Sequence, residues 1–270
     1  MPARADDRRR WMQSGALVLG AQALWALAGC SSSPRLPGPG PEPKRGSGAS
    51  QVLTPFSKGP QAIGAGRWEP WGRHPARPPT DYQVIREASQ TVLQASAMSS
   101  VSGLKHRVDR PASDFEQIRW RWRIDQILKG ADVGNRNAED SPARVLLAFD
   151  GNRSALSMRE LLVAEQFQLF TGQPMPYATL MYVWDTARPE GEVVQNPHTG
   201  RIRKLVVQSG SGQAGRWMTY ERDFARDFEK AFGEKPERLI GVGVMTDSDN
   251  TRQNARCLYG DVELIPRKLF

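Results

Sequence analysis

Four consecutive side chains with oxygen atoms, in the run Asp247-Ser248-Asp249-Asn250, form a dense group of candidate ligands. Carboxylate and amide oxygens are the ligands that calcium prefers. The run is not an EF-hand loop, because the sixth residue from Asp247 is Arg252 and the twelfth is Leu258. A turn in which acidic and amide side chains bind backbone N–H groups is the simpler interpretation, with calcium or sugar contact as alternatives. We therefore predict no metal and a structural turn made of Asp247, Asp249, Asn250 and Thr251.

Carboxylates could also perform acid–base chemistry on a glycan. Glycoside hydrolysis needs two carboxyl groups about 5 to 10 Å apart across a cleft. Asp247, Asp249 and Asp261 are catalytic candidates because they lie near the ends of predicted strands, and Asp185 is a further one. The sequence does not give the distances between them. A glycan hydrolase or lyase with paired carboxylates is therefore kept as the alternative function.

Other catalytic motifs are missing from the sequence. It contains no Gly-x-Ser-x-Gly nucleophile turn, no His-Glu-x-x-His zinc motif and no glycine-rich phosphate loop. The histidines have no recognisable partner spacing, and His198 lies in an Asn-Pro-His-Thr-Gly run that is typical of a turn. These observations predict no cofactor and favour a noncatalytic function.

Tryptophan side chains are candidates for sugar binding, because aromatic faces stack on sugar rings. Trp120 and Trp122 share one face of a predicted strand with isoleucines, which predicts a place in the core. Trp68 and Trp71 are three residues apart beside glycine and proline, and we predict that they form an exposed ligand-binding platform. A polysaccharide is the possible partner.

The first 29 residues have the composition of an export signal. Arg4 and the arginines at 8–10 precede an apolar stretch over residues 16–28, which is too short for a permanent membrane span. The stretch ends in Leu27-Ala28-Gly29-Cys30, which resembles the processing site of bacterial lipoproteins. The resemblance implies removal of residues 1–29 and acylation of Cys30, with two or more acyl chains that anchor the protein stably in a membrane.

The residues around the processing site also bear on the destination. In the resembled class from Gram-negative bacteria, an aspartate after the cysteine retains the protein in the inner membrane. Ser31 at this position therefore predicts a lipid-anchored protein of the outer membrane that faces the periplasm. The run from Arg8 to Met12 resembles a twin-arginine signal in part, so this route and the general secretory route are both open.

Residues 30–66 are predicted to be the acylated cysteine and a disordered tether. Proline, glycine and serine dominate this segment, which therefore buries too little apolar surface to offset its ordering entropy. Residues 67–270 are long enough for one domain. Cys257 has no partner after acylation of Cys30, and we expect it to be a small buried residue.

The charge of the chain is mildly basic. The formal net charge of +8 becomes +6 after removal of residues 1–29, which hold four arginines and two aspartates. Charges of both signs alternate along the rest, and no nucleic-acid-binding motif occurs. We predict no nucleic-acid partner.

Short runs with alternating apolar residues predict an antiparallel sandwich or barrel over residues 67–270. Two short helices are also expected. The first begins at a capping box of Ser157 and Glu160 and stops at Gly172, and the second carries an apolar stripe from Phe224 and ends at Gly233. The predicted strands cover residues 83–87, 92–97, 104–108, 117–124, 143–149, 178–184, 203–209, 217–221, 238–246 and 257–265.

The predicted strand 117–124 has arginines on the face opposite its tryptophans. Three like charges at alternate positions repel one another unless neighbours neutralise them. Asp261 and Glu263 share one face of the last predicted strand. We therefore predict that these two strands lie near each other, although two separately solvated strands are nearly as compatible with the pattern.

Four motifs together resemble a bacterial domain-of-unknown-function family, number 3047. They are Trp120-Arg121-Trp122-Arg123-Ile124, the run from Tyr177 to Trp184, the run from Gly241 to Thr251 and Tyr259-Gly260-Asp261-Val262. The resemblance covers Arg67 to about Ile265. It implies an exported, single jelly-roll sandwich of the galactose-binding type, and it implies no activity, substrate or cofactor.

The sequence thus predicts a mainly β protein, an antiparallel jelly-roll sandwich with two short helices. The predicted function is a noncatalytic binding or structural module of the cell envelope, with a glycan as the favoured ligand. A structural subunit of an envelope complex would show an exposed apolar patch instead of a groove.

Overall fold

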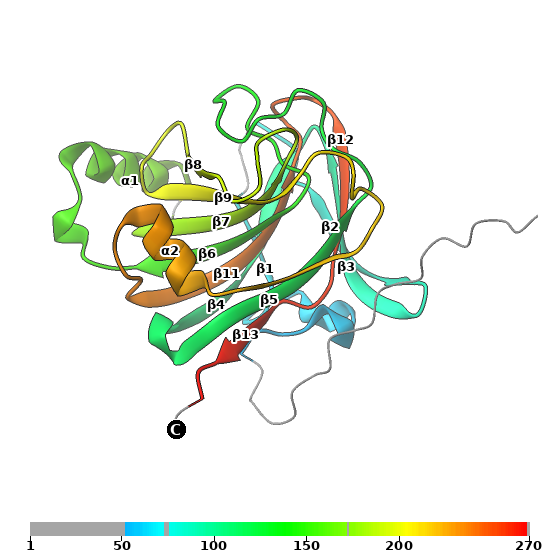
Figure 1. Ribbon diagram of the computed structural model, residues 1–270, viewed down its shortest axis with the longest axis horizontal. Coiled ribbons are helices and arrows are strands. Elements are labelled where there is room, and N and C mark those ends of the chain that lie inside the picture. Colours follow the sequence, from blue (N-terminus) through cyan, green and yellow to red (C-terminus); the bar gives the residue numbers. More distant parts are fainter. Residues whose placement is uncertain (1–51, 73–75, 172, 269–270) are drawn as a thin grey trace, which may run out of the picture. The chain divides into compact units, whose positions relative to one another are not determined.

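Two β-sheets pack face to face around one apolar cluster in the computed structural model, which describes residues 52–72, 76–171 and 173–268 (Figure 1). The first sheet has seven strands, in the order β1 (Glu69–Trp71), β4 (Val101–Pro111), β11 (Arg238–Asp247), β6 (Arg144–Asp150), β7 (Ala178–Asp185), β9 (Ile202–Ser209) and β8 (Val193–Gln195). The second has the order β10 (Met218–Arg222), β5 (Phe115–Ile124), β12 (Asn254–Tyr259), β3 (Gln90–Met98) and β2 (Asp81–Glu87), and β13 (Glu263–Pro266) pairs with β5. The predicted mainly β sandwich with two α-helices is confirmed.

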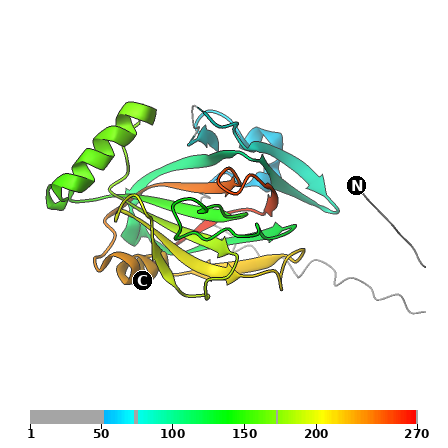
Figure 2. The same ribbon diagram turned by 90° about the horizontal axis from the view of Figure 1, so that it is seen from above.

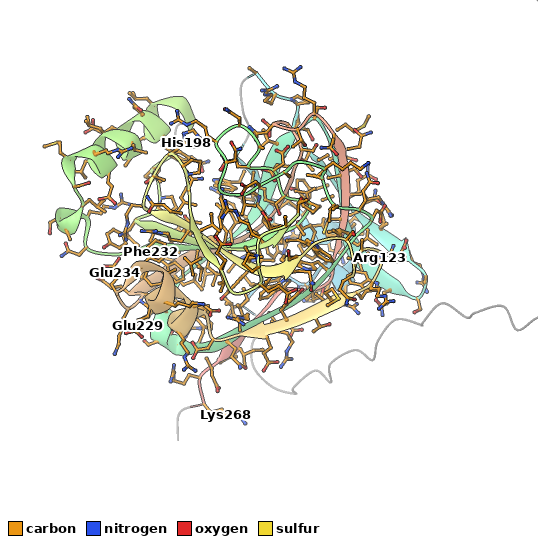
Figure 3. The ribbon with its side chains drawn as sticks, turned by 45° about the horizontal axis from the view of Figure 1, so that its top comes forward. Arg123, His198, Glu229, Phe232, Glu234 and Lys268 are labelled. Atoms are coloured by element: carbon orange, nitrogen blue, oxygen red, sulfur yellow. The ribbon has the colours of Figure 1, made fainter. Side chains whose placement is uncertain are left out.

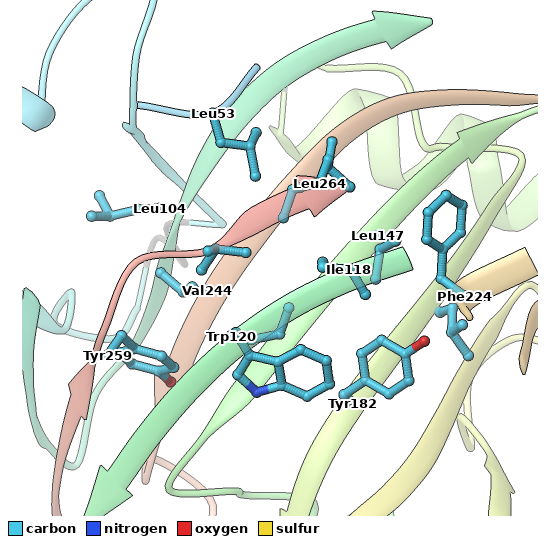
Figure 4. Packing of buried hydrophobic residues seen from close by; sticks show 14 of the residues in the cluster. Leu53, Leu104, Ile118, Trp120, Leu147, Tyr182, Phe224, Val244, Tyr259 and Leu264 are labelled. Atoms are coloured by element: carbon cyan, nitrogen blue, oxygen red, sulfur yellow. The ribbon is translucent and has the colours of Figure 1, made fainter. Parts of the chain in front are cut away.

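Strand β5 shows how the sequence pattern builds the core. Ile118, Trp120, Trp122 and Ile124 are buried, whereas the arginines between them are partly exposed on the opposite face. The ring of Trp120 stacks on that of Tyr182 from β7, with centroids 4.8 Å apart, and this contact joins the two sheets (Figure 4). The core position predicted for Trp120 and Trp122 is confirmed.

The predicted proximity of β5 and the last strand region is confirmed. Glu263 of β13 stands opposite Arg119 of β5, and the two side chains are 3.6 Å apart. Arg123 pairs instead with Glu87 at 2.6 Å. The predicted strand 257–265 is in fact two strands, β12 and β13, separated at 260–262.

Strands β7 and β9 run parallel, which corrects the purely antiparallel arrangement expected from the sequence. The chain leaves β7, forms β8 at the sheet edge and returns as β9 between them. Strands β1 and β8 have three residues each, too few to show an alternating pattern, and the sequence does not predict them.

The first helix begins at its predicted capping box, and the second begins at Phe224, where its apolar stripe starts. Ser157 precedes α1 (Met158–Thr171), and its hydroxyl and backbone N–H both donate to Glu160 Oε2, at 2.8 and 2.9 Å. The predicted stop at Gly172 lies outside the described residues. Gly233 ends α2 (Phe224–Phe232) with a φ of +75°. No helix in the described part of the chain is long and apolar enough to cross a bilayer.

The helix α2 packs its phenylalanine stripe against the first sheet. Phe224 and Phe228 are buried, and the ring of Phe228 lies 4.7 Å from that of Phe149 in β6. The side chain of Asp223 caps the helix by accepting the backbone N–H of Arg226. The stripe therefore serves packing, as its spacing predicts.

The segment 52–66 belongs to the folded domain, which corrects the predicted end of the tether at residue 66. Leu53 and Phe56 are fully buried in the main cluster, and two short 3-10 helices follow at Phe56–Lys58 and Pro60–Ala62. Composition is misleading here because two large apolar side chains suffice to dock a segment rich in proline and glycine. Residues 1–51, including Cys30, lie outside the described residues.

Candidate binding site

Asp247 ends β11 and is buried against Arg144 at the start of β6. The guanidinium donates to both carboxylate oxygens, from Nε to Oδ1 at 3.0 Å and from Nη2 to Oδ2 at 2.8 Å. The backbone N–H of Ser141 donates a third hydrogen bond, at 3.0 Å. Burial raises the pKa of Asp247 to about 6, more than the attraction of Arg144 lowers it. Asp247 therefore holds two strand ends together and presents no free carboxylate to a ligand.

The turn after β11 is capped by Asp140, a residue that the sequence does not single out. The Asp140 carboxylate accepts the backbone N–H groups of Asn250 and Thr251, at 3.2 and 2.6 Å, and the Thr251 hydroxyl at 2.7 Å. The acceptor thus comes from another loop, and Asp247 of the turn itself binds elsewhere. This corrects the prediction that the turn caps its own amides.

Three carboxylates come close enough to hold a cation. Ligand oxygens of Asp140, Asp247 and Asp249 all lie within 4.8 Å of one another. Asp247 is paired with Arg144, and Asp249 lies 3.5 Å from Arg77. Because these cations and the turn amides already balance the acidic charge, the cluster fits an internal network better than a calcium site.

The carboxylates considered for hydrolysis do not form one catalytic pair across a cleft. Asp261 follows β12, whereas Asp247 and Asp249 precede it, and six residues at about 3.3 Å each put roughly 20 Å between the two ends. Asp261 accepts from the backbone N–H and hydroxyl of Ser57, at 2.8 and 2.6 Å. Asp185 is buried and accepts the backbone N–H of Val133 at 3.0 Å. Asp247, Asp261 and Asp185, all candidates from the sequence, are therefore engaged by protein groups.

A second buried ion pair lies beneath the loop 126–142. Lys204 Nζ donates to Glu139 and to the carbonyl of Val133, both at 2.6 Å, and its side chain is 1% exposed. Burial and the nearby Arg144 lower the pKa of Lys204. The loop packs Val133 on the outer face of the seven-stranded sheet, defined as the face turned away from the second sheet. The loop 126–142 therefore covers part of this outer face and shields it from solvent.

The predicted exposed platform of Trp68 and Trp71 is wrong for Trp68. Trp68 is fully buried, with its ring centroid 4.8 Å from that of Phe56 and 5.5 Å from that of His106. Its Nε1 donates to the carbonyl of Thr54 at 2.7 Å. The segment 52–66 folds back over the indole, so Trp68 stabilises the fold. Trp71, at the end of β1, is half-buried.

Trp71 lies at the edge of the outer face, where neighbouring strands carry glycines. A Cβ on Gly103 of β4 would come 3.3 Å from the Trp71 ring, so the indole packs close to this glycine. A Cβ on Gly241 of β11 would meet no side chain within 4 Å. Lys105 and Arg107 share a face with Gly103 because side chains alternate along β4. Gly103 is thus buried beside the indole, which packs on the apolar cluster of this face, and long polar side chains of β4 border the exposed part of Trp71.

Trp217 is the other half-buried tryptophan of the domain, and the sequence gives it no role. It lies beside β10 of the second sheet, with the guanidinium carbons of Arg121 and Arg123 at 4.8 and 5.8 Å from its ring centroid. These arginines hold the indole by cation–π contacts. Trp217 is therefore a suitable control for Trp71, because it is also partly buried and lies on the other sheet.

A polar pocket of about 230 Å³ lies between the first turns of α1 and the loop joining β8 to β9. His198, interpreted from sequence as a turn residue, lies in a turn and also lines this pocket beside α1 (Figure 3). Its Nδ1 is 3.4 Å from Arg136, and its Nε2 is 3.9 Å from Glu139. The pocket could not be read from the sequence, because its walls come from segments separated along the chain.

Helix α1 carries an apolar stripe exposed to solvent. The exposed fractions of Met158, Leu162 and Leu169 are 73%, 53% and 84%. Spacings of four and seven residues place these side chains on one side of the helix. Exposed Glu165 lies on the same side between Leu162 and Leu169, so a charge interrupts the stripe. Figure 2 shows the helix, coloured green, standing away from both sheets. This stripe is an exposed apolar patch of the kind expected for a structural subunit.

Comparison with known proteins gives a family and several distant structures. The family model described as "Protein of unknown function (DUF3047)" matches residues 66–263. No curated protein sequence matches the chain.

Solved structures align over most of the chain at low identity. The family 11 carbohydrate-binding module from Clostridium thermocellum, in complex with a mixed-linked tetrasaccharide, is 10% identical with a TM-score of 0.34, over 77% of this chain and 93% of that one. Endoglucanase cel12A from Rhodothermus marinus is 10% identical with a TM-score of 0.43, over 77% and 95%. The xyloglucanase domain of NopAA from Sinorhizobium fredii is 7% identical with a TM-score of 0.40, over 74% and 93%.

Proposed function

This chain belongs to the DUF3047 family, and we propose that it is a noncatalytic glycan-binding module. The observation that carries the proposal is Trp71, half-buried beside Gly103 at the edge of the outer face. The exposed part of a half-buried indole can stack on a sugar ring. Lys105 and Arg107, which already contact Gln173 and Asp109, have further N–H groups that can donate to sugar hydroxyl groups. The aspartates considered for hydrolysis bind protein groups instead, which favours binding over cleavage.

Affinity electrophoresis of the purified full chain tests this function. Gels containing soluble glucan, mannan or alginate should retard the wild type, and Trp71→Ala should lose most of the retardation with one of them. Trp217→Ala is the matched control, because it removes another partly buried indole from the other sheet, and it should keep the retardation. Equal retardation of the two variants would contradict a role for Trp71 in glycan binding.

A second measurement separates binding from cleavage. The wild type should release no reducing ends from any polymer that retards it. Release that is abolished by Asp247→Asn or Asp261→Asn in a folded protein would reject the noncatalytic proposal and favour the hydrolase or lyase.

We further propose that the domain is exported and anchored in the outer membrane, facing the periplasm, through acylated Cys30. The support is the order of arginines, apolar stretch and small residues before this cysteine. Cys30→Ala should give an uncleaved precursor that takes up no labelled fatty acid. Equal labelling of the variant and the wild type would contradict the anchor.

The exposed stripe of α1 favours a second candidate, a structural subunit that docks this helix on an apolar surface. If it does so with another copy of the chain, light scattering should show association that Leu162→Lys with Leu169→Lys abolishes. A monomeric wild type at all concentrations would remove self-association as the role of α1.

A further inference from the structure

The polar pocket beside α1 has an opening in its wall at Gly200, in the loop before β9. A Cβ added to Gly200 would lie 3.5 Å from Oε1 of Glu160 and 3.7 Å from Nε2 of Gln195. These are ordinary van der Waals distances, so an added methyl group would be accommodated without displacing its neighbours. The glycine therefore leaves a space, about one carbon atom in size, between an acceptor and a donor.

Both polar groups at this space are available for a ligand. The two hydrogen bonds from Ser157 end on Oε2 of Glu160, and among the described residues no hydrogen bond ends on Oε1. None involves the side-chain amide of Gln195 either. Burial alone would raise the pKa of Glu160, but the hydrogen bonds from Ser157 outweigh it and leave the pKa below its ordinary value. Glu160 therefore offers an ionised acceptor at neutral pH.

The rest of the lining fits a small polar molecule with some apolar surface. Arg159 and His198 add hydrogen-bonding groups, and Val163 and Pro197 add apolar surface. Asn196 and Thr199 also line the pocket, are both 8% exposed and are held by hydrogen bonds to Glu139 and to the backbone N–H of Arg201. A volume of about 230 Å³ suits a single ring better than the middle of a polymer chain.

We propose that this pocket binds one neutral sugar ring, at a chain end, through two neighbouring hydroxyl groups. One hydroxyl donates to Glu160 Oε1, and the other accepts from Gln195 Nε2. A carboxylate in place of the first hydroxyl would have no proton to donate to Glu160 Oε1 and would face its charge directly, whereas Arg159 lines another part of the pocket. This inference rests on the proposed glycan-binding function and adds a second contact to it, away from Trp71.

Saturation-transfer NMR on the purified full chain tests the pocket, with the methyl glycosides of glucose, galactose and mannose as neutral probes and methyl glucuronide as the acidic probe. At least one neutral glycoside should bind the wild type. Gly200→Ala should weaken this binding about tenfold or more, because the methyl group occupies the space between the two polar atoms. Glu160→Gln should also weaken it while preserving the capping box, which accepts glutamine.

Gly212→Ala is the matched control. A Cβ on Gly212 would meet nothing within 4 Å, so this variant makes the same chemical change away from the pocket and should bind like the wild type. Absence of binding by every neutral glycoside, stronger binding of the glucuronide, or equal binding by Gly200→Ala would each overturn the inference. Polymer retardation that depends on Trp71 would then still support the proposed function, so the two failures are distinguishable.

Discussion

Buried charges are the distinctive residues of this domain. Asp247 and Arg144 are 4% and 3% exposed, and Lys204 is fully buried near them. Removing one member of a buried ion pair leaves the other charge without a partner and without water. These buried charges therefore hold the ends of β6 and β11 together. Removal of one charge should lower the free energy of unfolding more than removal of both members of a pair.

We predict that Asp247→Ala lowers the free energy of unfolding by about 3 to 5 kcal/mol, because it leaves the Arg144 guanidinium buried and unpaired. The double change Arg144→Met with Asp247→Leu should lose less than the sum of the two single changes, since no isolated charge remains. Urea unfolding monitored by tryptophan fluorescence measures both quantities. A loss below about 1 kcal/mol for Asp247→Ala would show that water or another cation reaches Arg144.

At the scale of elements, His106 of β4 ties the segment 52–66 to the sandwich. A carbonyl can only accept, so Nδ1 carries the proton and donates to the carbonyl of Arg107 at 2.8 Å. Nε2 then accepts the backbone N–H of Thr54 at 3.3 Å. Burial lowers the pKa of His106, and the hydrogen bond to the Arg107 carbonyl and the charge of Glu69 oppose this shift only in part. A second proton would remove the acceptor of the Thr54 backbone N–H, and only the Thr54 hydroxyl, 3.2 Å from Nε2, could then accept from the ring.

This contact predicts a pH dependence with a definite sign. Because the folded-state pKa of His106 lies below 6.5, its stabilisation is present above pH 6.5 and is lost as the pH falls through the folded pKa. Asp247 works in the opposite direction, since its raised pKa of about 6 favours folding at low pH and loses that contribution as the pH rises through 6. The contribution of His106 to the pH dependence of unfolding is therefore measured as the difference between the wild type and a variant without this histidine.

The free energy of unfolding should fall more steeply from pH 7.5 to pH 5 in the wild type than in His106→Gln, whose side chain gains no charge. Urea titrations at a series of pH values give the two slopes, and both proteins retain Asp247. Parallel curves would mean that the contact between His106 and Thr54 does not depend on the neutral ring.

Local signals predict much of the secondary structure, for reasons that particular elements make plain. The alternation in β5 and the capping residues Ser157 and Gly233 are short-range features, and the structure confirms them. The three-residue strands and the parallel pair β7 and β9 depend on long-range pairing, which no local pattern encodes. The predicted exposure of Trp68 is wrong for the same reason, because the residues that cover it belong to a segment with the composition of a linker.

The candidate site belongs to the whole molecule. The pocket combines α1 with the loop before β9, and the surface beside Trp71 combines β1, β4 and β11. Sequence reasoning named Trp71 but not Gly103, Gly200 or Asp140, because a glycine or a capping aspartate gains its role only from what packs beside it. The sequence therefore predicted one residue of the surface beside Trp71, but not the strands and glycines that surround this residue.

The domain as a whole should need its residues from 52 onward. Leu53 and Phe56 are fully buried, and burying each such side chain contributes about 1.5 to 3 kcal/mol, so a chain of residues 67–270 should lose roughly 3 to 6 kcal/mol. That loss is a large part of the 5 to 15 kcal/mol that keeps a typical domain folded. A chain of residues 52–270 keeps both side chains and should unfold at the same urea concentration as the protein lacking only residues 1–29. Equal urea midpoints for 67–270 and 52–270 would show that the segment 52–66 packs on the domain without stabilising the domain.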